Sequence, residues 1–371
     1  MLAVGCDDEE PRAQSAAGAP ASAAGCGGDS TGCAGATGGA TAVPIPSSAG
    51  QGGGATGAGR SAGAPSAGAA GVAAQPDAGA AGSSAAADAG MPDAGTIATC
   101  TGCETYADPV LRANVQAAQL DALSGAASSL RNPGVLFAHN DRNQTDVFAL
   151  DEQGAELARI TLDVVVSDIE DMAVGPCPEG SCVYVADIGD NAAARAEYAL
   201  LRFTEPEIAR GGGVAELGVE PERFRFEYED GSHNAEGLLV EPRSGAVYVV
   251  TKVAAGQPSS VYRLQEPLDP ETLHRATKVA DLTVPGAGNM PASAAAAHPC
   301  GLGFAIRTYD ALYEFRIASG AAFEDAFGVT PTPLPAPDEP QSEALTYLPD
   351  GRGLLSTGEG AAAPIYQLLC P

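Results

Sequence analysis

The stretch DIEDMAV at residues 168–174 has two near-copies in this chain, NAEGLLV at 234–240 and SEALTYL at 342–348. In each stretch a glutamate stands just before an apolar run, and these glutamates are Glu170, Glu236 and Glu343. Equivalent residues of structural repeats occupy equivalent places in a fold. If the repeats are blades around one axis, the three carboxylates meet near that axis. Like charges held together require a cation, a proton or a ligand with donor groups.

The pattern around these stretches recurs about every 50 residues, as short apolar segments separated by Gly, Pro, Asn and Asp. We therefore predict an all-β fold, a β-propeller of five four-stranded blades. Residues 110–118 are expected to supply the last strand of the fifth blade, although 110–123 also fits a helical pattern. The alternatives are a sixth blade within 203–233, or a β-sandwich, which would leave the recurring phrases unexplained.

The chain divides by composition. Residues 7–99 are almost all Ala, Gly, Ser, Pro, Thr and Asp, without an aromatic residue, and we predict that they form a disordered linker. Residues 100–371 hold every Tyr and Phe and are predicted to form the propeller. The formal net charge is −28, from 47 acidic against 19 basic residues, with no basic cluster. We therefore expect no nucleic-acid partner, because phosphate contacts would have to overcome this field.

The first residues, MLAVGC, resemble the end of a bacterial lipoprotein signal, with Cys6 as the lipidated residue. We interpret residues 1–6 as a truncated signal remnant whose true start lies upstream, because a basic region and an apolar core are missing. No stretch of about 20 apolar residues is present to span a bilayer. The expected location is the bacterial cell envelope, on its periplasmic or its surface face, with a lipid anchor as the only membrane contact.

Export implies an oxidising compartment, in which cysteines form disulfides by default. Of the nine cysteines, Cys177 and Cys182 frame a Pro/Gly turn between two strands, and we predict that they are bonded. The pairing of four others remains open at this point: Cys100, Cys103, Cys300 and Cys370.

A family resemblance supports the same fold. The phrases DIEDMAVGPC and CVYVADIGDN, with NPGVLFAHND upstream and DEPQSEALTYLPDGRGLL downstream, resemble a group of exported bacterial β-propeller lipoproteins of uncharacterised activity. In that group the first phrase reads W-E-D-[IM]-A, and the resemblance covers residues 120–369. It implies a propeller and export, and it implies no reaction. Here Ile169 replaces the Trp, and the fourth unit, NMPASAAAA, lacks an acidic opening, so the ring of carboxylates is expected to be incomplete.

In a propeller the start of each innermost strand and the end of the second strand lie at the same mouth of the channel. Calcium takes six to eight oxygen ligands in flexible geometry, which suits such a rim. The predicted calcium ligands are Glu170, Asp187, Asp190, Glu236 and Glu343. The residues predicted to contact a polar ligand are Asn140, Asp141, Asn191, Lys252, Arg307, Tyr309 and Glu359. A competing interpretation is that the carboxylates only cap strand ends.

These residues lead to three functional hypotheses. The first is an envelope-tethered binding module whose funnel takes a ligand or cation, with a small molecule, a glycan or an envelope protein as partner. The second is a calcium-dependent hydrolase of a lactone, ester or phosphoester, with His139 as general base. The third is a purely structural propeller. Residues 100–371, the predicted folded part, hold no GxSxG, P-loop or GxGxxG motif, so whether the protein is an enzyme stays open.

Overall fold

The computed structural model describes residues 100–371, except 142–143, 283–290 and 340. The predicted signal remnant, the lipidated Cys6 and the linker at 7–99 lie outside the described residues. Within the described part, no helix is long and apolar enough to cross a membrane. The one 3-10 helix of note there is η2 (Phe323–Gly328).

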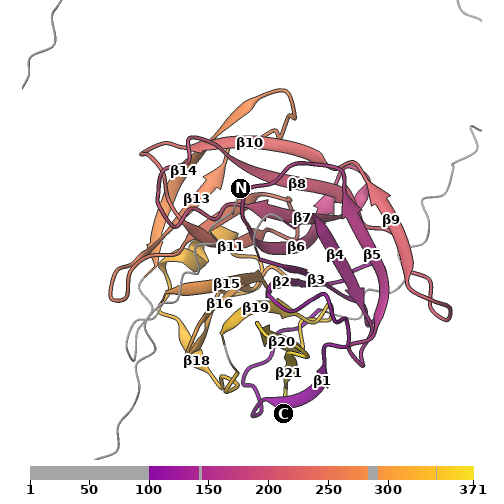
Figure 1. Cartoon of the computed structure of the whole chain (residues 1–371). Coiled ribbons are helices and arrows are strands. Elements are labelled where there is room, and N and C mark those ends of the chain that lie inside the picture. The colour runs from indigo at the N-terminus through magenta and orange to yellow at the C-terminus, as the bar shows by residue number, and fades with distance from the viewer. Residues whose placement is uncertain (1–99, 142–143, 283–290, 340) are drawn as a thin grey trace, which may run out of the picture. The chain divides into compact units, whose positions relative to one another are not determined.

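Five antiparallel meanders surround one axis (Figure 1). Their innermost strands contact one another in a closed ring: β2 (Leu123–Ser128), β6 (Ile169–Cys177), β11 (Ala235–Val240), β15 (Ala292–Ala297) and β19 (Ser342–Tyr347). The second strands are β3 (Leu136–Asn140), β7 (Gly180–Asp187), β12 (Val247–Thr251), β16 (Gly303–Thr308) and β20 (Gly353–Gly358). The third strands are β4 (Asp146–Leu150), β8 (Tyr198–Thr204), β13 (Ser259–Leu264), β17 (Leu312–Arg316) and β21 (Pro364–Leu369).

The outermost strands are β5 (Glu156–Leu162), β10 (Glu222–Tyr228), β14 (Leu273–Leu282), β18 (Thr332–Leu334) and β1 (Val110–Asn114). β1 pairs antiparallel with β21, so the N-terminal end of the domain completes the last meander, as predicted. The helical reading of 110–123 is wrong. Residues 110–114 instead pair through their backbone with β21, in a sheet whose other strands come from the C-terminal part of the chain.

The predicted class, an all-β propeller, is confirmed, but the sheets are not five separate four-stranded blades. β10 and β14 pair in parallel and merge two meanders into one eight-stranded sheet. β9 (Ala215–Val219) pairs in parallel with β5 and makes a five-stranded sheet. The segment 203–233, considered above for a sixth blade, thus forms no blade of its own. It supplies β9 and β10, which pair with the outer strands β5 and β14.

A hydrophobic cluster fills the space between each neighbouring pair of meanders. Between the first and second, for example, Phe137 and Ile160 pack with Val185 and Leu201, all fully buried. β-Branched and aromatic residues favour strands because they pack well on a pleated surface. Stacking both faces of every meander in this way buries the core between the sheets and leaves the axis to short side chains.

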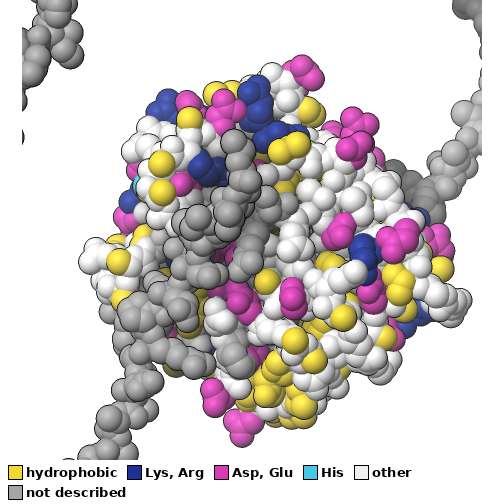
Figure 2. Space-filling view, in the orientation of Figure 1, with side chains coloured by type: hydrophobic (Ala, Val, Ile, Leu, Met, Phe, Trp, Pro, Cys, Tyr) yellow, Lys and Arg dark blue, Asp and Glu magenta, His cyan; other side chains and the backbone are white. Residues whose placement is uncertain are grey.

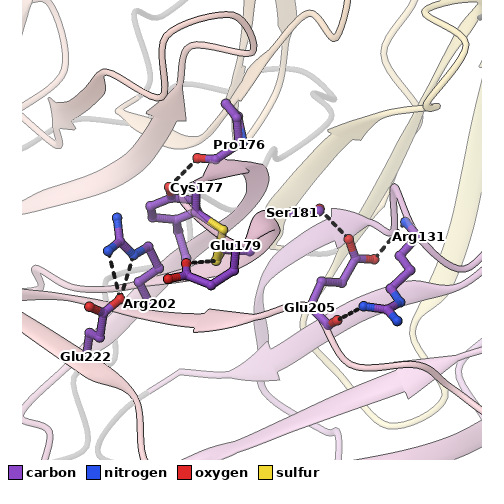
Figure 3. The surroundings of a disulfide bond; sticks show 10 residues. Arg131, Pro176, Cys177, Glu179, Ser181, Arg202, Glu205 and Glu222 are labelled. Atoms are coloured by element: carbon purple, nitrogen blue, oxygen red, sulfur yellow. Dashed lines mark hydrogen bonds and ion pairs between the residues drawn. A yellow bond between two sulfur atoms is a disulfide. The ribbon is translucent and has the colours of Figure 1, made fainter. Parts of the chain in front are cut away.

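Three disulfides brace the domain. Cys177 and Cys182 are bonded across the β6–β7 hairpin, as predicted (Figure 3). Next to this hairpin, the buried Glu205 accepts hydrogen bonds from the Ser181 hydroxyl at 2.5 Å and the Arg131 amide at 3.1 Å. The other two disulfides, Cys100–Cys300 and Cys103–Cys370, tie the segment before β1 to the fourth meander and to the C-terminus. They reinforce the same closure that β1 makes through its backbone.

Candidate functional site

Every innermost strand is interrupted by a β-bulge at the same place. The pairing with the second strand skips one residue in each meander, and the skipped residues are Ser124, Glu170, Glu236, Ser293 and Glu343. A bulge leaves its extra residue out of the ladder and redirects the side chain. The three predicted glutamates therefore share one structural position, at one mouth of the channel, and serines hold it in the other two meanders.

Each second strand places one further residue at this mouth, directly after its last paired residue. These residues are Asp141, Ile188, Lys252, Tyr309 and Glu359. Four of them were predicted as ligand contacts, because strand ends were expected to share a rim. The acidic character of the molecule is visible in Figure 2, where Asp and Glu side chains are more widespread than Lys and Arg on the face shown.

One half of the rim is neutralised by the protein itself. The ammonium of Lys252 lies 2.5 Å from Glu236 Oε1 and donates to the hydroxyl of Tyr309 at 2.8 Å. That hydroxyl donates in turn to Glu343 Oε1 at 3.0 Å. Burial and the charges of Glu236 and Glu359 raise the pKa of Glu343 to about 9, although Lys252 opposes the shift. Burial likewise raises the pKa of Glu236 to about 7, against the opposing Lys252 charge.

The other half of the rim holds three carboxylates from two meanders. Asp141 follows β3, whereas Asp168 and Glu170 lie at the start of β6, and one oxygen of each lies within 4.8 Å of the other two. Glu170 is only 5% exposed, and no described residue donates a hydrogen bond or ion pair to its carboxylate. Burial, followed by the charges of Glu236 and Asp141, raises the pKa of Glu170 well above its usual range. Burial, then Asp141, raises the pKa of Asp168 to about 6.

Gly189 makes room for this group of carboxylates. A Cβ atom at this position would collide with Oε1 of Glu170 and Oδ2 of Asp168. The glycine of the ADIGDN phrase thus has a specific role here, which is the close approach of backbone to two carboxylates. We call Asp141, Asp168 and Glu170 the acidic triad.

The structure separates the predicted calcium ligands into different roles. Asp187 is fully buried, accepts hydrogen bonds from the Ser167 and Asp168 amides, and pairs with Arg195 at 2.9 Å. Asp190 accepts from the Ala194 and Arg195 amides and from the Tyr198 hydroxyl.

The carboxylates of Asp187 and Asp190 are therefore occupied by internal donors. Among the described residues, the groups within mutual ligand distance do not include Glu170, Glu236 and Glu343 together. The three glutamates share a rim and interact through their charges, but they do not converge on one point.

Two further predicted residues lie inside the protein. Arg307 is fully buried; its guanidinium donates to Pro337 O at 3.1 Å and to the Ser342 hydroxyl, and lies 3.4 Å from Glu339. His139 is 1% exposed, and its Nδ1 lies 2.8 Å from Asn140 O. Burial lowers the pKa of His139 to about 4, so the ring is neutral at pH 7. A catalytic role for His139 stays a prediction without support from its position.

The remaining predicted residues are amides that shape the rim. Asn140 is buried; its Oδ1 accepts from the Ala122 amide at 3.0 Å, and its Nδ2 donates to Gln119 O. Asn191 accepts a hydrogen bond from Asn234 at 3.0 Å and is exposed. Both amides hold loops in place, and only Asn191 is open to solvent.

Two acidic residues of the DIEDMAV phrase have roles that sequence reasoning did not assign to them. Asp168 belongs to the acidic triad, and its position two residues before the glutamate was the available signal. Asp171 is fully buried and accepts from the amides of Met172 at 2.8 Å, Leu238 at 2.7 Å and Ala295 at 3.3 Å. Its carboxylate therefore joins β6, β11 and β15 inside the ring, a role that the sequence pattern did not indicate.

The sulfur-containing group at the β6–β7 hairpin is not a metal site. Cys177, Glu179 and Cys182 also lie within mutual ligand distance. The two cysteines are joined in a disulfide and have no thiolate to offer.

Comparison with known proteins adds little to this geometry. No family model matches the chain, and no curated protein matches it. Among solved structures, the chain is similar to the β-propeller domain of Myceliophteria thermophila Cps50 (Swd1), with 10% sequence identity and a TM-score of 0.36. The match covers 66% of this chain and 83% of that chain. A likeness at this level carries no argument, so the propeller assignment rests on strand topology and the site on its own contacts.

Proposed function

We propose that this protein is an exported, envelope-tethered binding module that takes one calcium ion at the acidic mouth of its propeller. The observation that carries the proposal is the acidic triad. Its member Glu170 is a buried carboxylate to which no described residue donates a hydrogen bond or ion pair, beside two further carboxylates, and the charge of Lys252 only partly opposes the rise of its pKa. Such an arrangement needs a cation or a proton to offset the repulsion.

The chemistry of the triad favours a hard cation. All of its donors are carboxylate oxygens, and calcium accepts such ligands in flexible geometry and completes its shell with backbone oxygens or water. Magnesium requires near-ideal octahedral geometry and is the weaker candidate. An ion here would sit at the mouth of the channel with open positions, where the oxygens of a small molecule, a glycan or an envelope protein complete its coordination.

The cysteines support export. The six cysteines of residues 100–371 form three disulfides, an arrangement typical of oxidising compartments. The lipobox-like MLAVGC segment and the Ala/Gly/Ser-rich stretch after it fit a lipid anchor at Cys6 and a long tether. We do not extend the proposal to hydrolysis, because His139, the predicted base, is buried and the pKa of about 4 that burial gives it makes the ring a weak base.

The test is calorimetric titration of calcium into the metal-stripped full-length chain. We expect one ion per chain, and a native-state gain of about 2.7 kcal/mol at a hundredfold excess over the dissociation constant, reversed by chelator. Glu170→Gln should abolish binding. The matched control is Glu343→Gln, which replaces a buried carboxyl group of the same rim outside the acidic triad, and it should bind calcium.

The results also separate a specific site from a general attraction of cations. Equal losses from Glu170→Gln and Glu343→Gln would mean that diffuse charge, and not the triad, attracts the ion. A wild-type protein that binds no calcium while Glu170→Gln raises its melting temperature would show mere repulsion, and the calcium proposal would be abandoned.

A further inference from the structure

The opposite mouth of the channel is built from the same repeat and has the opposite chemistry. Six positions after each bulge residue, from 124 to 130 in the first meander, the chain carries Leu130, Pro176, Pro242, Pro299 and Pro349. At about 3.3 Å per strand residue, this ring lies roughly 20 Å along the strands from the acidic mouth. The two mouths are therefore separate places.

All five residues of this ring line a single cavity of about 300 Å³. None of the described residues that line it is Asp, Glu, Lys, Arg or His, in a chain whose net charge is −28. A charged ligand would lose its hydration there without gaining a partner. The lining is mainly apolar, with Ser128 and Thr346 among its hydroxyl-bearing members, and it thus excludes ions and selects for an uncharged, mainly apolar molecule.

Small side chains keep the cavity open. Ala126, Ala173 and Ala297 line it at places where the inner strands could carry larger residues, and Ala173 and Ala297 are half-buried. The wall beside Pro299 is held covalently, because Cys100 also lines the cavity and is bonded to Cys300. A cavity formed and fixed in this way needs no rearrangement to accept a ligand, which favours binding.

We propose that this apolar mouth is a second binding site, for a neutral hydrocarbon ligand of about two aromatic rings or an alkyl chain of about ten carbons. The size follows from the volume, since an apolar cavity of about 150 Å³ accommodates benzene. The charge selectivity follows from the uncharged lining. The site is independent of calcium and of the acidic triad.

The test uses the full-length protein and the neutral fluorophore N-phenyl-1-naphthylamine, whose emission rises in apolar surroundings. We expect saturable binding of the fluorophore and its displacement by decan-1-ol. The charged analogues decanoate and decylammonium should displace the fluorophore with at least about tenfold lower affinity. Ala173→Leu and Ala297→Leu, which fill the cavity, should each weaken binding by roughly tenfold or more. Ala254→Leu, on an exposed turn, is the matched control and should bind as wild type does.

Two further measurements keep the test decisive. Circular dichroism confirms that the filled variants fold, and the competitor series requires no variant. Glu170→Gln should leave fluorophore binding unchanged, because the acidic triad lies at the other mouth. The hydrocarbon site can therefore be confirmed even if the calcium proposal fails. The inference is overturned if folded wild-type protein does not bind the fluorophore, if charged and neutral competitors act alike, or if both filled variants bind normally. A further variant, Ile97→Ser, removes the large apolar side chain that shortly precedes Cys100. If the fluorophore binds to Ile97→Ser but not to the wild type, the chain before Cys100 is the occupant of the cavity, and the inference is overturned.

Discussion

The ammonium of Lys252 lies 2.5 Å from Oε1 of Glu236, so half of the acidic mouth carries its own cation. The same ammonium reaches Glu343 through the hydroxyl of Tyr309. Glu170, at the equivalent bulge of the neighbouring meander, has no such partner among the described residues. One repeat position is thus used in two ways, and the difference between them is the reason that we propose the acidic triad as a site for an external ion.

Replacing Lys252 by Gln should destabilise the protein by roughly 1.5–3 kcal/mol, the range for a lost hydrogen bond to a charged group. The substitution leaves the mostly buried carboxylate of Glu236 without its counter-charge. Urea unfolding at pH 8 measures the effect. Lys252→Arg retains a cation and should recover part of the loss. An unchanged midpoint for Lys252→Gln would show that solvent already screens the pair.

The metal-free protein should lose stability as the pH rises from about 4.5 to about 9 through Glu343. Its pKa is raised from 4.5 to about 9 in the folded state. Between these values the folded state binds the proton and the unfolded state does not, so stability falls with increasing pH. Melting temperatures measured in chelator across this range should decline less steeply for Glu343→Gln. Parallel curves for the two proteins would contradict the assignment.

Gly189→Ala should weaken calcium binding by about tenfold or more while the fold is retained. The new Cβ would push against Glu170 and Asp168 and displace two of the three carboxylates. Calorimetry compares it with Gly213→Ala, where an added Cβ meets no atom within 4 Å. Both glycines lie in loops, so a loss confined to Gly189→Ala identifies the contact as the cause. Equal affinities for both variants would place the ion elsewhere.

Asp171→Ala should destabilise the domain by more than about 3 kcal/mol, because it leaves three buried amides on three inner strands without their acceptor. Asp171→Asn keeps one acceptor oxygen and should cost less. Chemical denaturation gives both values. If alanine and asparagine cost the same small amount, water replaces the carboxylate, and Asp171 does not hold the ring together.

Several features were determined by the sequence alone. The repeats opened by DIEDMAV identified an all-β propeller, because each unit alternates apolar strands with turn residues. They also placed Glu170, Glu236 and Glu343 at one position, since a repeated phrase takes a repeated backbone. The Cys177–Cys182 pair followed from a short turn between two strands, where no other partner is as near.

Only the tertiary structure decided which side chains meet. Asp141 and Glu170 come from different meanders, and the closure of the ring brings their carboxylates together. Arg307 was expected at the rim and instead turns inward to Glu339, because the buried carboxylate compensates its charge. The merging of two meanders through β10 and β14 depends on outer-edge contacts that no repeat encodes. A sequence repeat determines a repeated local backbone conformation, and therefore which residue positions lie at a mouth of the channel. The partner of each charge is set by packing between segments distant in the chain, which local sequence does not record.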